Sequence, residues 1–530
     1  MLETLARVSD GLRSRMLPAR VGHRAADRRW LAYVLLFLLA VVLMITNPWF
    51  ALIDDEAYQV GSAAQPMGIV ATQFKTHAAQ LHLPLPDIIL HCWLVLTQNS
   101  LLLLRVPSIL FFVLGIWVCS RIAKEVAGAA AAEATVILGL LWPYGFHFGR
   151  YAVWLPLCFF LLACVTYTYL RWLEQPTARH LSWFVIVALA LLYTNFMGWA
   201  FLAMLGVDFL CRRELHSPVH CSQIAVALGI LVVCYAPVWP EFVQLFKDRG
   251  PAVPATAFFT FLYSVYVLFA SESIAPWVVG LSVPLMLCII GCGVVIQLKA
   301  ARFARMLCAF VIVLALALAL SGEINQKRVM PLGVWLLTSA GIAFATVPPR
   351  WRRWLIIGFT CMASISWFGI ISRRFYSTTR SFEPWQQISH LAAISALSGE
   401  TVIGNHPAFL FYLTHELMKA EGLQARHFKG NYGEQVRRRG IYHVTEWTAA
   451  GHPTSPRVLF VAALYGTDFE STTDGAAWLD QYCARERTER FVENPKYELK
   501  RNVFGPAQGS QWRIEVRRYA CNHQSNVPGP

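Results

Sequence analysis

Residues 101–119 read LLLLRVPSILFFVLGIWVC and carry a single charged side chain, that of Arg105. A helix that crosses a bilayer needs about 20 mostly apolar residues, because hydrocarbon offers no partner to unpaired backbone groups. Together with its flanks, this stretch predicts a transmembrane helix. Further apolar blocks of this kind lie at Leu31–Ile45, Ala152–Leu170, Ile224–Pro237, Trp277–Ile296, Met306–Leu320, Met330–Thr346 and Leu355–Ile371.

The composition of the whole chain is that of a membrane protein. Of its 530 residues, 56% are hydrophobic and only 14% are charged, and the mean hydropathy is +0.47. A soluble domain has about a quarter of its residues charged. The net charge of +14 lies mostly in short loops between apolar blocks, where it fixes topology. Because no solvated basic face with interleaved aromatic residues is present, we expect no nucleic-acid partner.

The topology follows from the alternation of basic loops. Arginines are frequent in residues 1–29, before the first apolar block, and predict a cytoplasmic basic leader. From there every second loop is basic, which gives about 11 to 13 transmembrane helices over residues 30–376 and puts the rest of the chain outside. Leu85–Leu96 and Phe258–Phe269 are apolar but short, so we expect them to be interfacial or re-entrant.

The composition changes to that of an ordinary globular protein over residues 377–530. Helix-like segments alternate with apolar runs such as Thr401–Gly404 and Arg457–Leu464, and the length of about 150 residues is normal for a domain. The predicted helices are Pro384–Ala396, Pro407–Lys419 and Asp474–Ala484. We therefore expect a soluble α/β domain on the outer side of the membrane. Export of this domain would allow Cys483 and Cys521 to form a disulfide.

Three consecutive carboxylates, Asp54, Asp55 and Glu56, lie near the start of the outer loop 49–100. A carboxylate among apolar walls at the membrane surface can act as a general base towards an acceptor hydroxyl. Its neighbour can hold a metal ion or orient a sugar. A solvated turn that caps the next helix would explain the same residues without any chemistry, and this alternative stays open.

Later outer loops carry positive charge, against the inside bias of membrane proteins. Arg150 lies in one of them, and Lys327 and Arg328 lie in another. A lipid phosphate is the natural ligand, because arginine binds its oxygens bidentately. For Arg373 and Arg374, after the last apolar block, snorkelling to lipid head groups explains the charge.

Several short motifs follow one another in order along these loops. They are Asp55-Glu56-Ala57-Tyr58, His82-Leu83-Pro84-Leu85, Leu104-Arg105-Val106-Pro107-Ser108, Gly149-Arg150-Tyr151-Ala152, Leu192-Tyr193-Thr194-Asn195 and Lys327-Arg328-Val329-Met330-Pro331. In order and sidedness the motifs resemble the GT-C class of membrane glycosyltransferases. Within that class they resemble the protein O-mannosyltransferases and the lipid A aminoarabinosyltransferases.

The resemblance implies a function: a sugar moves, with inversion, from a polyprenyl-phosphate carrier to a hydroxyl of a glycolipid, polysaccharide or protein at the outer face. It implies that Asp55 is the catalytic base with Glu56 as its partner. It also implies that Arg150, Lys327 and Arg328 bind the carrier phosphate. The expected substrate-binding residues are Asp54, Tyr58, His82, Tyr151 and Asn195.

A divalent metal ion is an option at Glu56 and His82, since three histidines lie in the outer loop, although not at a recognised ligand spacing. The chain also departs from the family pattern twice. Leu83 separates His82 from Pro84, where family members often have a double proline. Residues 153–155 are Val, Trp and Leu, where an aspartate commonly follows the Arg-Tyr motif. The second departure indicates a divergent acceptor.

Two other classes of protein remain as alternatives. A secondary transporter would show inverted repeats and binding groups near the bilayer midplane. No half-to-half symmetry is visible here, and the candidate polar residues lie at one membrane face. A non-catalytic assembly protein with an exported domain would leave the carboxylates idle. The compact loops favour a bacterial inner membrane, with the C-terminal domain in the periplasm.

Overall fold

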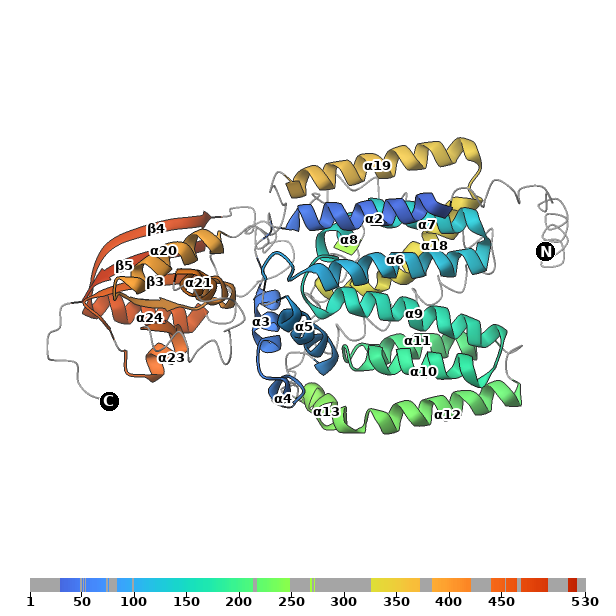
Figure 1. The fold of residues 1–530 in the computed structure, drawn as a ribbon, viewed down its shortest axis with the longest axis horizontal. Coiled ribbons are helices and arrows are strands. Elements are labelled where there is room, and N and C mark those ends of the chain that lie inside the picture. The colour runs from blue at the N-terminus through green and yellow to red at the C-terminus, as the bar shows by residue number, and fades with distance from the viewer. Residues whose placement is uncertain are drawn as a thin grey trace.

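The protein consists of a helical bundle and a smaller α/β domain at one end of it (Figure 1). Several sequence-based expectations lie outside the described residues, namely the basic leader 1–28, His82, the apolar blocks Trp277–Ile296 and Met306–Leu320, and Arg373 and Arg374. The computed structural model describes residues 29–47, 50, 52, 54–72, 75, 83–97, 100–212, 217–247, 267–268, 271, 326–371, 384–420, 440–452, 454–464, 469–493 and 513–521.

The bundle is built from apolar helices that run along the longest axis of the molecule (Figure 1). Their buried side chains form one hydrophobic core. The helices are α2 (Arg29–Ile45), α6 (Val106–Ala127), α7 (Ala129–Leu141), α9 (Trp154–Glu174), α10 (Ala178–Leu192), α11 (Gly198–Leu210), α12 (Pro218–Cys234), α18 (Gly333–Thr346) and α19 (Pro349–Ile371).

Glycine and proline determine where two helices of the bundle end. Gly128, at φ 87°, separates α6 from α7 in a conformation that residues with a side chain avoid. Trp142 is extended, as expected for a residue that precedes a proline, and the short helix α8 (Pro143–Phe148) then begins. The alternation of basic loops predicts a span over Ala127–His147; in the structure, the proline divides this stretch into α7 and α8.

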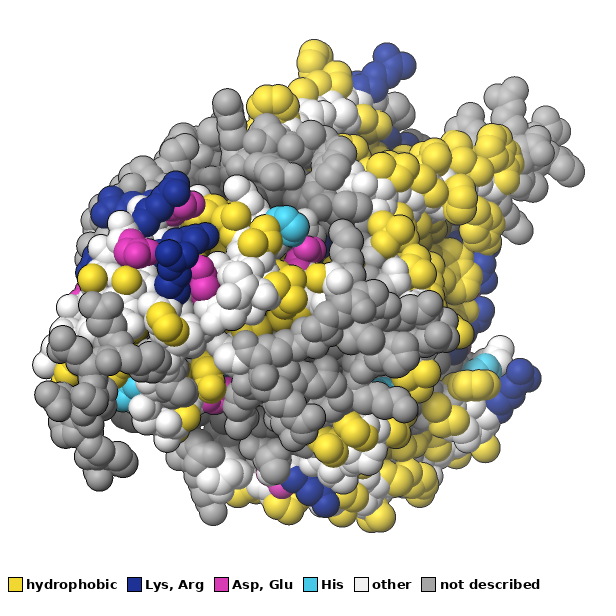
Figure 2. Space-filling view, turned by 60° about the vertical axis from the view of Figure 1, so that its left-hand side comes forward, with side chains coloured by type: hydrophobic (Ala, Val, Ile, Leu, Met, Phe, Trp, Pro, Cys, Tyr) yellow, Lys and Arg dark blue, Asp and Glu magenta, His cyan; other side chains and the backbone are white. Residues whose placement is uncertain are grey.

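The described helices include two, α6 and α9, that are long and apolar enough to cross a membrane. A third span results if α12 and the helical segment after it, bent by 47° at their junction, count as one. Hydrophobic side chains cover the flank of the bundle at the right of Figure 2, and Phe37 and Phe368 on α2 and α19 are about two-thirds exposed. These features identify an integral membrane protein. The expected total of about 11 to 13 spans stays a prediction.

Short helices gather at the end of the bundle that faces the C-terminal domain (Figure 1). They are α3 (Asp54–Ala63), α4 (Met67–Val70), α5 (Pro84–Leu96) and α13 (Trp239–Lys247). The two prolines of α5 lie in its first turn, where their missing N–H groups cost nothing. With 13 residues, α5 is too short to cross a bilayer, in agreement with the expected interfacial helix over Leu85–Leu96.

The C-terminal domain contains a mixed five-stranded sheet in the order β2-β1-β3-β5-β4. The first three strands in this order are parallel, and β5 runs antiparallel to both β3 and β4. The strands are β1 (Thr401–Gly404), β2 (Ile441–His443), β3 (Arg457–Ala463), β4 (Ala484–Glu493) and β5 (Arg513–Ala520).

Helices cover both faces of this sheet. Side chains alternate along the central strand β3, so that Leu459 and Val461 face α20 (Trp385–Leu397) and α21 (Pro407–Ala420). Val458 and Phe460 belong to the cluster of the opposite face, with α23 (Val444–Ala449) and α24 (Phe469–Tyr482). A disulfide between Cys483 and Cys521 joins the start of β4 to the end of β5. The α/β architecture expected for this region is therefore present.

Candidate active site

Helix α3 carries the carboxylates and presents them on different faces. Residues three or four apart lie on the same face of a helix. Glu56, Gln59 and Val60 are buried on one face, whereas Asp55 and Tyr58 are partly exposed on another. The helical period therefore separates the two neighbouring carboxylates, one into the protein and one towards the outside. The side chain of Asp54 lies outside the described part of the structure.

Glu56 is held by an arginine from the start of α6. Nε and Nη2 of Arg105 donate to the two carboxylate oxygens at 2.7 and 2.6 Å, and both side chains are almost completely buried. The backbone N–H of Ala152 donates to the same carboxylate at 2.8 Å. A buried ion pair offsets its desolvation only when geometry and hydrogen bonds are good, as they are here. Glu56 thus joins α3 to α6 and to the turn before α9.

Arg105 also reaches the chain that leads from α2 into α3. Its Nη1 donates to the side-chain oxygen of Asn47 and to the carbonyl oxygen of Phe50, both at 3.0 Å. The planar guanidinium suits this use, because its donors point in several fixed directions at once. A single residue therefore contacts the end of α2, the connecting segment and the carboxylate on α3.

Gln59 provides a second attachment on the buried face of α3. Its amide donates to Asp87 on α5 at 3.0 Å and accepts the backbone N–H of Trp154 at 3.1 Å. Neither Gln59 nor the pairing of Arg105 was among the expected site residues. The spacing of Glu56 and Gln59 on one helix face is the sequence signal that points to them. Their partners, however, lie too far along the chain to be read from a pattern.

Arg150 lies in the turn between α8 and α9 and is completely buried. It donates to Thr46 Oγ1 at 2.7 Å and to the carbonyl oxygen of Phe146 at 3.0 and 3.3 Å. Its guanidinium carbon lies 4.2 Å from the ring centroid of Phe50 and 4.7 Å from that of Phe146. Among the described residues, no carboxylate forms an ion pair with it.

The other expected site residues have different surroundings. The hydroxyl of Tyr151 bonds to His147 Nε2 at 2.7 Å, and Nδ1 of that histidine lies 3.3 Å from Ser271 Oγ. Asn195 is buried, and its side-chain oxygen accepts the backbone N–H of Met197 at 2.9 Å, in the turn just before α11. The structure therefore brings Asp55, Glu56, Arg150 and Tyr151 to one end of the bundle, and Asn195 stabilises the turn between α10 and α11.

No protein-family model matches the sequence, and no curated protein matches it. The structure resembles that of ArnT from Cupriavidus metallidurans in the apo state, with a TM-score of 0.56 and 14% identity over 93% of this chain and 98% of that one. The chain has the GT-C fold. ArnT bound to undecaprenyl phosphate has a TM-score of 0.55 and 14% identity, over 95% of this chain and 99% of that one.

An oligosaccharyltransferase from Archaeoglobus fulgidus, in complex with zinc and sulfate, has a TM-score of 0.49 and 12% identity, over 88% of this chain and 72% of that one.

The 3-10 helix η6 (Gln326–Leu332) packs against α8 and α9. The backbone of Lys327 and Arg328 thus belongs to an element beside the Arg150 turn, although their side chains lie outside the described part. Within the described ranges, no group of three or more His, Cys, Asp and Glu side chains could hold a metal ion.

Proposed function

We propose that this protein is a glycosyltransferase that moves a sugar from a polyprenyl-phosphate carrier to an acceptor hydroxyl at the outer face of the membrane. The observation that carries the proposal is the division of roles on α3. Glu56 is engaged by Arg105 and Ala152, which leaves Asp55 on the accessible face of a firmly held helix. A general base needs this combination of access and fixed position.

The carrier is supported by the surroundings of Arg150. A buried guanidinium without a carboxylate partner is costly, and a phosphate would supply the missing negative charge. Lys327 and Arg328, on the neighbouring η6, are proposed to complete this phosphate site. The solved complex of ArnT with undecaprenyl phosphate supports a polyprenyl carrier for a chain of this fold.

In the proposed mechanism, the carboxylate of Asp55 takes the proton of the acceptor hydroxyl as its oxygen attacks the anomeric carbon. The bond from that carbon to the phosphate oxygen breaks, and the polyprenyl phosphate leaves with the electron pair. Arg150 stabilises the charge that develops on the phosphate, an effect worth about 3 kcal/mol for one well-aimed donor. A single displacement inverts the anomeric centre. Asp54, Tyr58, His82, Tyr151 and Asn195 are proposed to bind substrate.

We propose a positioning role for Glu56, because Arg105 already binds both of its oxygens. This pairing counts against Glu56 as a ligand of a divalent ion, and we derive no step through a metal. The acceptor class stays open among glycolipid, polysaccharide and protein hydroxyls. A bacterial inner membrane, with the C-terminal domain in the periplasm, is part of the same proposal.

The test is sugar transfer by the purified full-length protein from radiolabelled polyprenyl-phosphate sugars, with Asp55→Asn measured alongside. Loss of the base should lower kcat about 100-fold or more without unfolding the protein. Asp474→Asn, at an exposed aspartate on α24, is the matched control and should keep full activity. Retained activity in Asp55→Asn would contradict the assignment of the base. If the folded wild type turns over no carrier, a transporter or an assembly protein becomes the better explanation.

A further inference from the structure

A hydrogen bond joins the C-terminal domain to the segment that leads into the catalytic helix. The backbone N–H of Leu52, three residues before Asp55, donates to the hydroxyl of Tyr412 on α21 at 2.9 Å. Tyr412 lies 360 residues further along the chain and is 4% exposed. The C-terminal domain therefore supplies the hydrogen-bond acceptor for a backbone N–H that lies just before α3.

Apolar packing also connects α3 to the C-terminal domain. Its buried residues Ala57, Val60 and Ala63 belong to one apolar cluster with Phe409 and Tyr412 of the C-terminal domain, and not to the large core of the bundle. Glu56 and Gln59, on the same helix, form polar contacts with the bundle. The helix that carries Asp55 is thus held both by polar contacts with the bundle and by the apolar cluster that it shares with the C-terminal domain.

A cavity of about 170 Å³ lies directly beside the Leu52–Tyr412 bond. Its walls include Phe50, Leu52, Arg105, Gln386 and Tyr412, so it is bounded by both parts of the molecule. Without the hydroxyl of Tyr412, the N–H of Leu52 would face this space, and the segment would have room to move. Because a buried N–H donor without a hydrogen-bond partner is energetically unfavourable, the segment around Leu52 would move to find one.

We propose that Tyr412 is a positioning residue of the active site, which fixes the segment before α3 and through it the carboxylate of Asp55. This inference rests on the proposed function, because it takes Asp55 as the base. The soluble domain then has a role in the reaction itself: it sets the geometry of the catalytic carboxylate from outside the membrane. A displacement of about 1 Å in such a group can cost a large part of the rate.

The experiment compares Tyr412→Phe with the wild type in the full-length protein in detergent. The substitution removes one oxygen and keeps the ring that packs in the apolar cluster, so the fold should persist. We expect faster hydrogen exchange at the amide of Leu52 and a kcat about 10-fold lower, with the KM for the lipid donor unchanged. Tyr482→Phe, at an exposed tyrosine of the same domain, is the matched control and should alter neither quantity.

Measuring Asp55→Asn in the same assay separates this inference from the proposed function. If Asp55→Asn is inactive while Tyr412→Phe keeps its full kcat, the positioning role is overturned and the function stands. If Asp55→Asn stays active, the assignment of the base fails, and with it the catalytic part of this inference; if the folded wild type transfers no sugar, the proposed function itself fails. Unchanged exchange at Leu52 in Tyr412→Phe overturns the structural part in either case.

Discussion

Two buried arginines at the end of the bundle that faces the C-terminal domain have opposite surroundings. Arg105 is neutralised by Glu56, so its charge serves to hold the structure together. Arg150 has a hydroxyl, a carbonyl oxygen and two aromatic rings around it. Aromatic faces attract a cation but do not neutralise it. The sequence contains both residues in short motifs, and only their contacts tell the structural arginine from the one available to a ligand.

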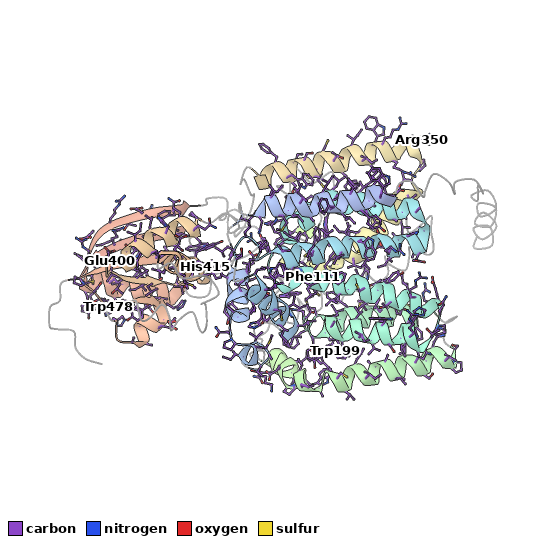
Figure 3. The ribbon with its side chains drawn as sticks, in the orientation of Figure 1. Phe111, Trp199, Arg350, Glu400, His415 and Trp478 are labelled. Atoms are coloured by element: carbon purple, nitrogen blue, oxygen red, sulfur yellow. A yellow bond between two sulfur atoms is a disulfide. The ribbon has the colours of Figure 1, made fainter. Side chains whose placement is uncertain are left out.

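Replacement of Arg150 by methionine should therefore separate binding from stability. Because the variant loses a buried charge that no carboxylate in the described part of the chain pairs with, we expect a thermal midpoint that is unchanged or higher. We expect the KM for a polyprenyl-phosphate sugar to rise about 10-fold or more, because the phosphate loses a charged donor. Arg350→Met, at an exposed arginine at the opposite end of the bundle (Figure 3), is the control. An unchanged KM in Arg150→Met would remove this residue from the phosphate site.

At the scale of elements, α3 is an amphipathic helix whose buried face carries two polar side chains, those of Glu56 and Gln59. The sequence predicted the importance of its carboxylates but not their division of roles. Asp55 and Glu56 differ by one position, and one position is 100° of rotation on a helix, enough to bury one and expose the other. The ion pair of Glu56 with Arg105 spans 49 residues and depends on how α3 and α6 pack, which no local pattern contains.

The ion pair between α3 and α6 should be expensive to break. Glu56→Gln leaves Arg105 buried without its counter-charge, and we expect a loss of about 3 to 5 kcal/mol in the free energy of unfolding. The matched control is Glu125→Gln, which breaks the partly exposed pair with Arg171 at the other end of α6 and should cost less than about 1 kcal/mol. Thermal unfolding in detergent measures both. Equal shifts would mean that the buried pair is not a structural link.

For the molecule as a whole, apolar length and turn residues predicted much of the fold. The predicted helices over Pro384–Ala396 and Pro407–Lys419 correspond closely to α20 and α21, because both sequences contain good local signals. The contact between the segment just before α3 and the C-terminal domain was not predictable, since it joins Leu52 to Tyr412, which are 360 positions apart. Long-range packing of this kind depends on three-dimensional shape, which periodicity does not encode.

The junction between the two parts should respond to pH through His415 on α21. This residue lies against the ring of Phe411, on the side of the domain nearest the bundle (Figure 3), and burial lowers its pKa to about 4. In the unfolded chain, where the pKa of a histidine is about 6.5, His415 binds a proton that it does not bind in the folded domain. The free energy of unfolding therefore keeps its full value above pH 6.5 and decreases as the pH drops towards 4, by at most about 3 kcal/mol.

Tryptophan fluorescence during denaturant unfolding, repeated over this pH range, measures the effect. His415→Gln should flatten the pH dependence, because glutamine does not titrate. His390→Gln, at an exposed histidine of the neighbouring helix α20, should retain it. A slope that survives in His415→Gln would assign the acid sensitivity to other groups.

The shared cluster of α3 and the C-terminal domain also determines how chimeras of such proteins should be designed. A recombinant enzyme that takes its membrane helices from one parent and its soluble domain from another would join mismatched halves at Ala57, Val60 and Ala63. The natural boundary for exchange is therefore discontinuous in sequence. Residues 52–63 have to match the C-terminal domain at Ala57, Val60 and Ala63 and the bundle at Glu56 and Gln59.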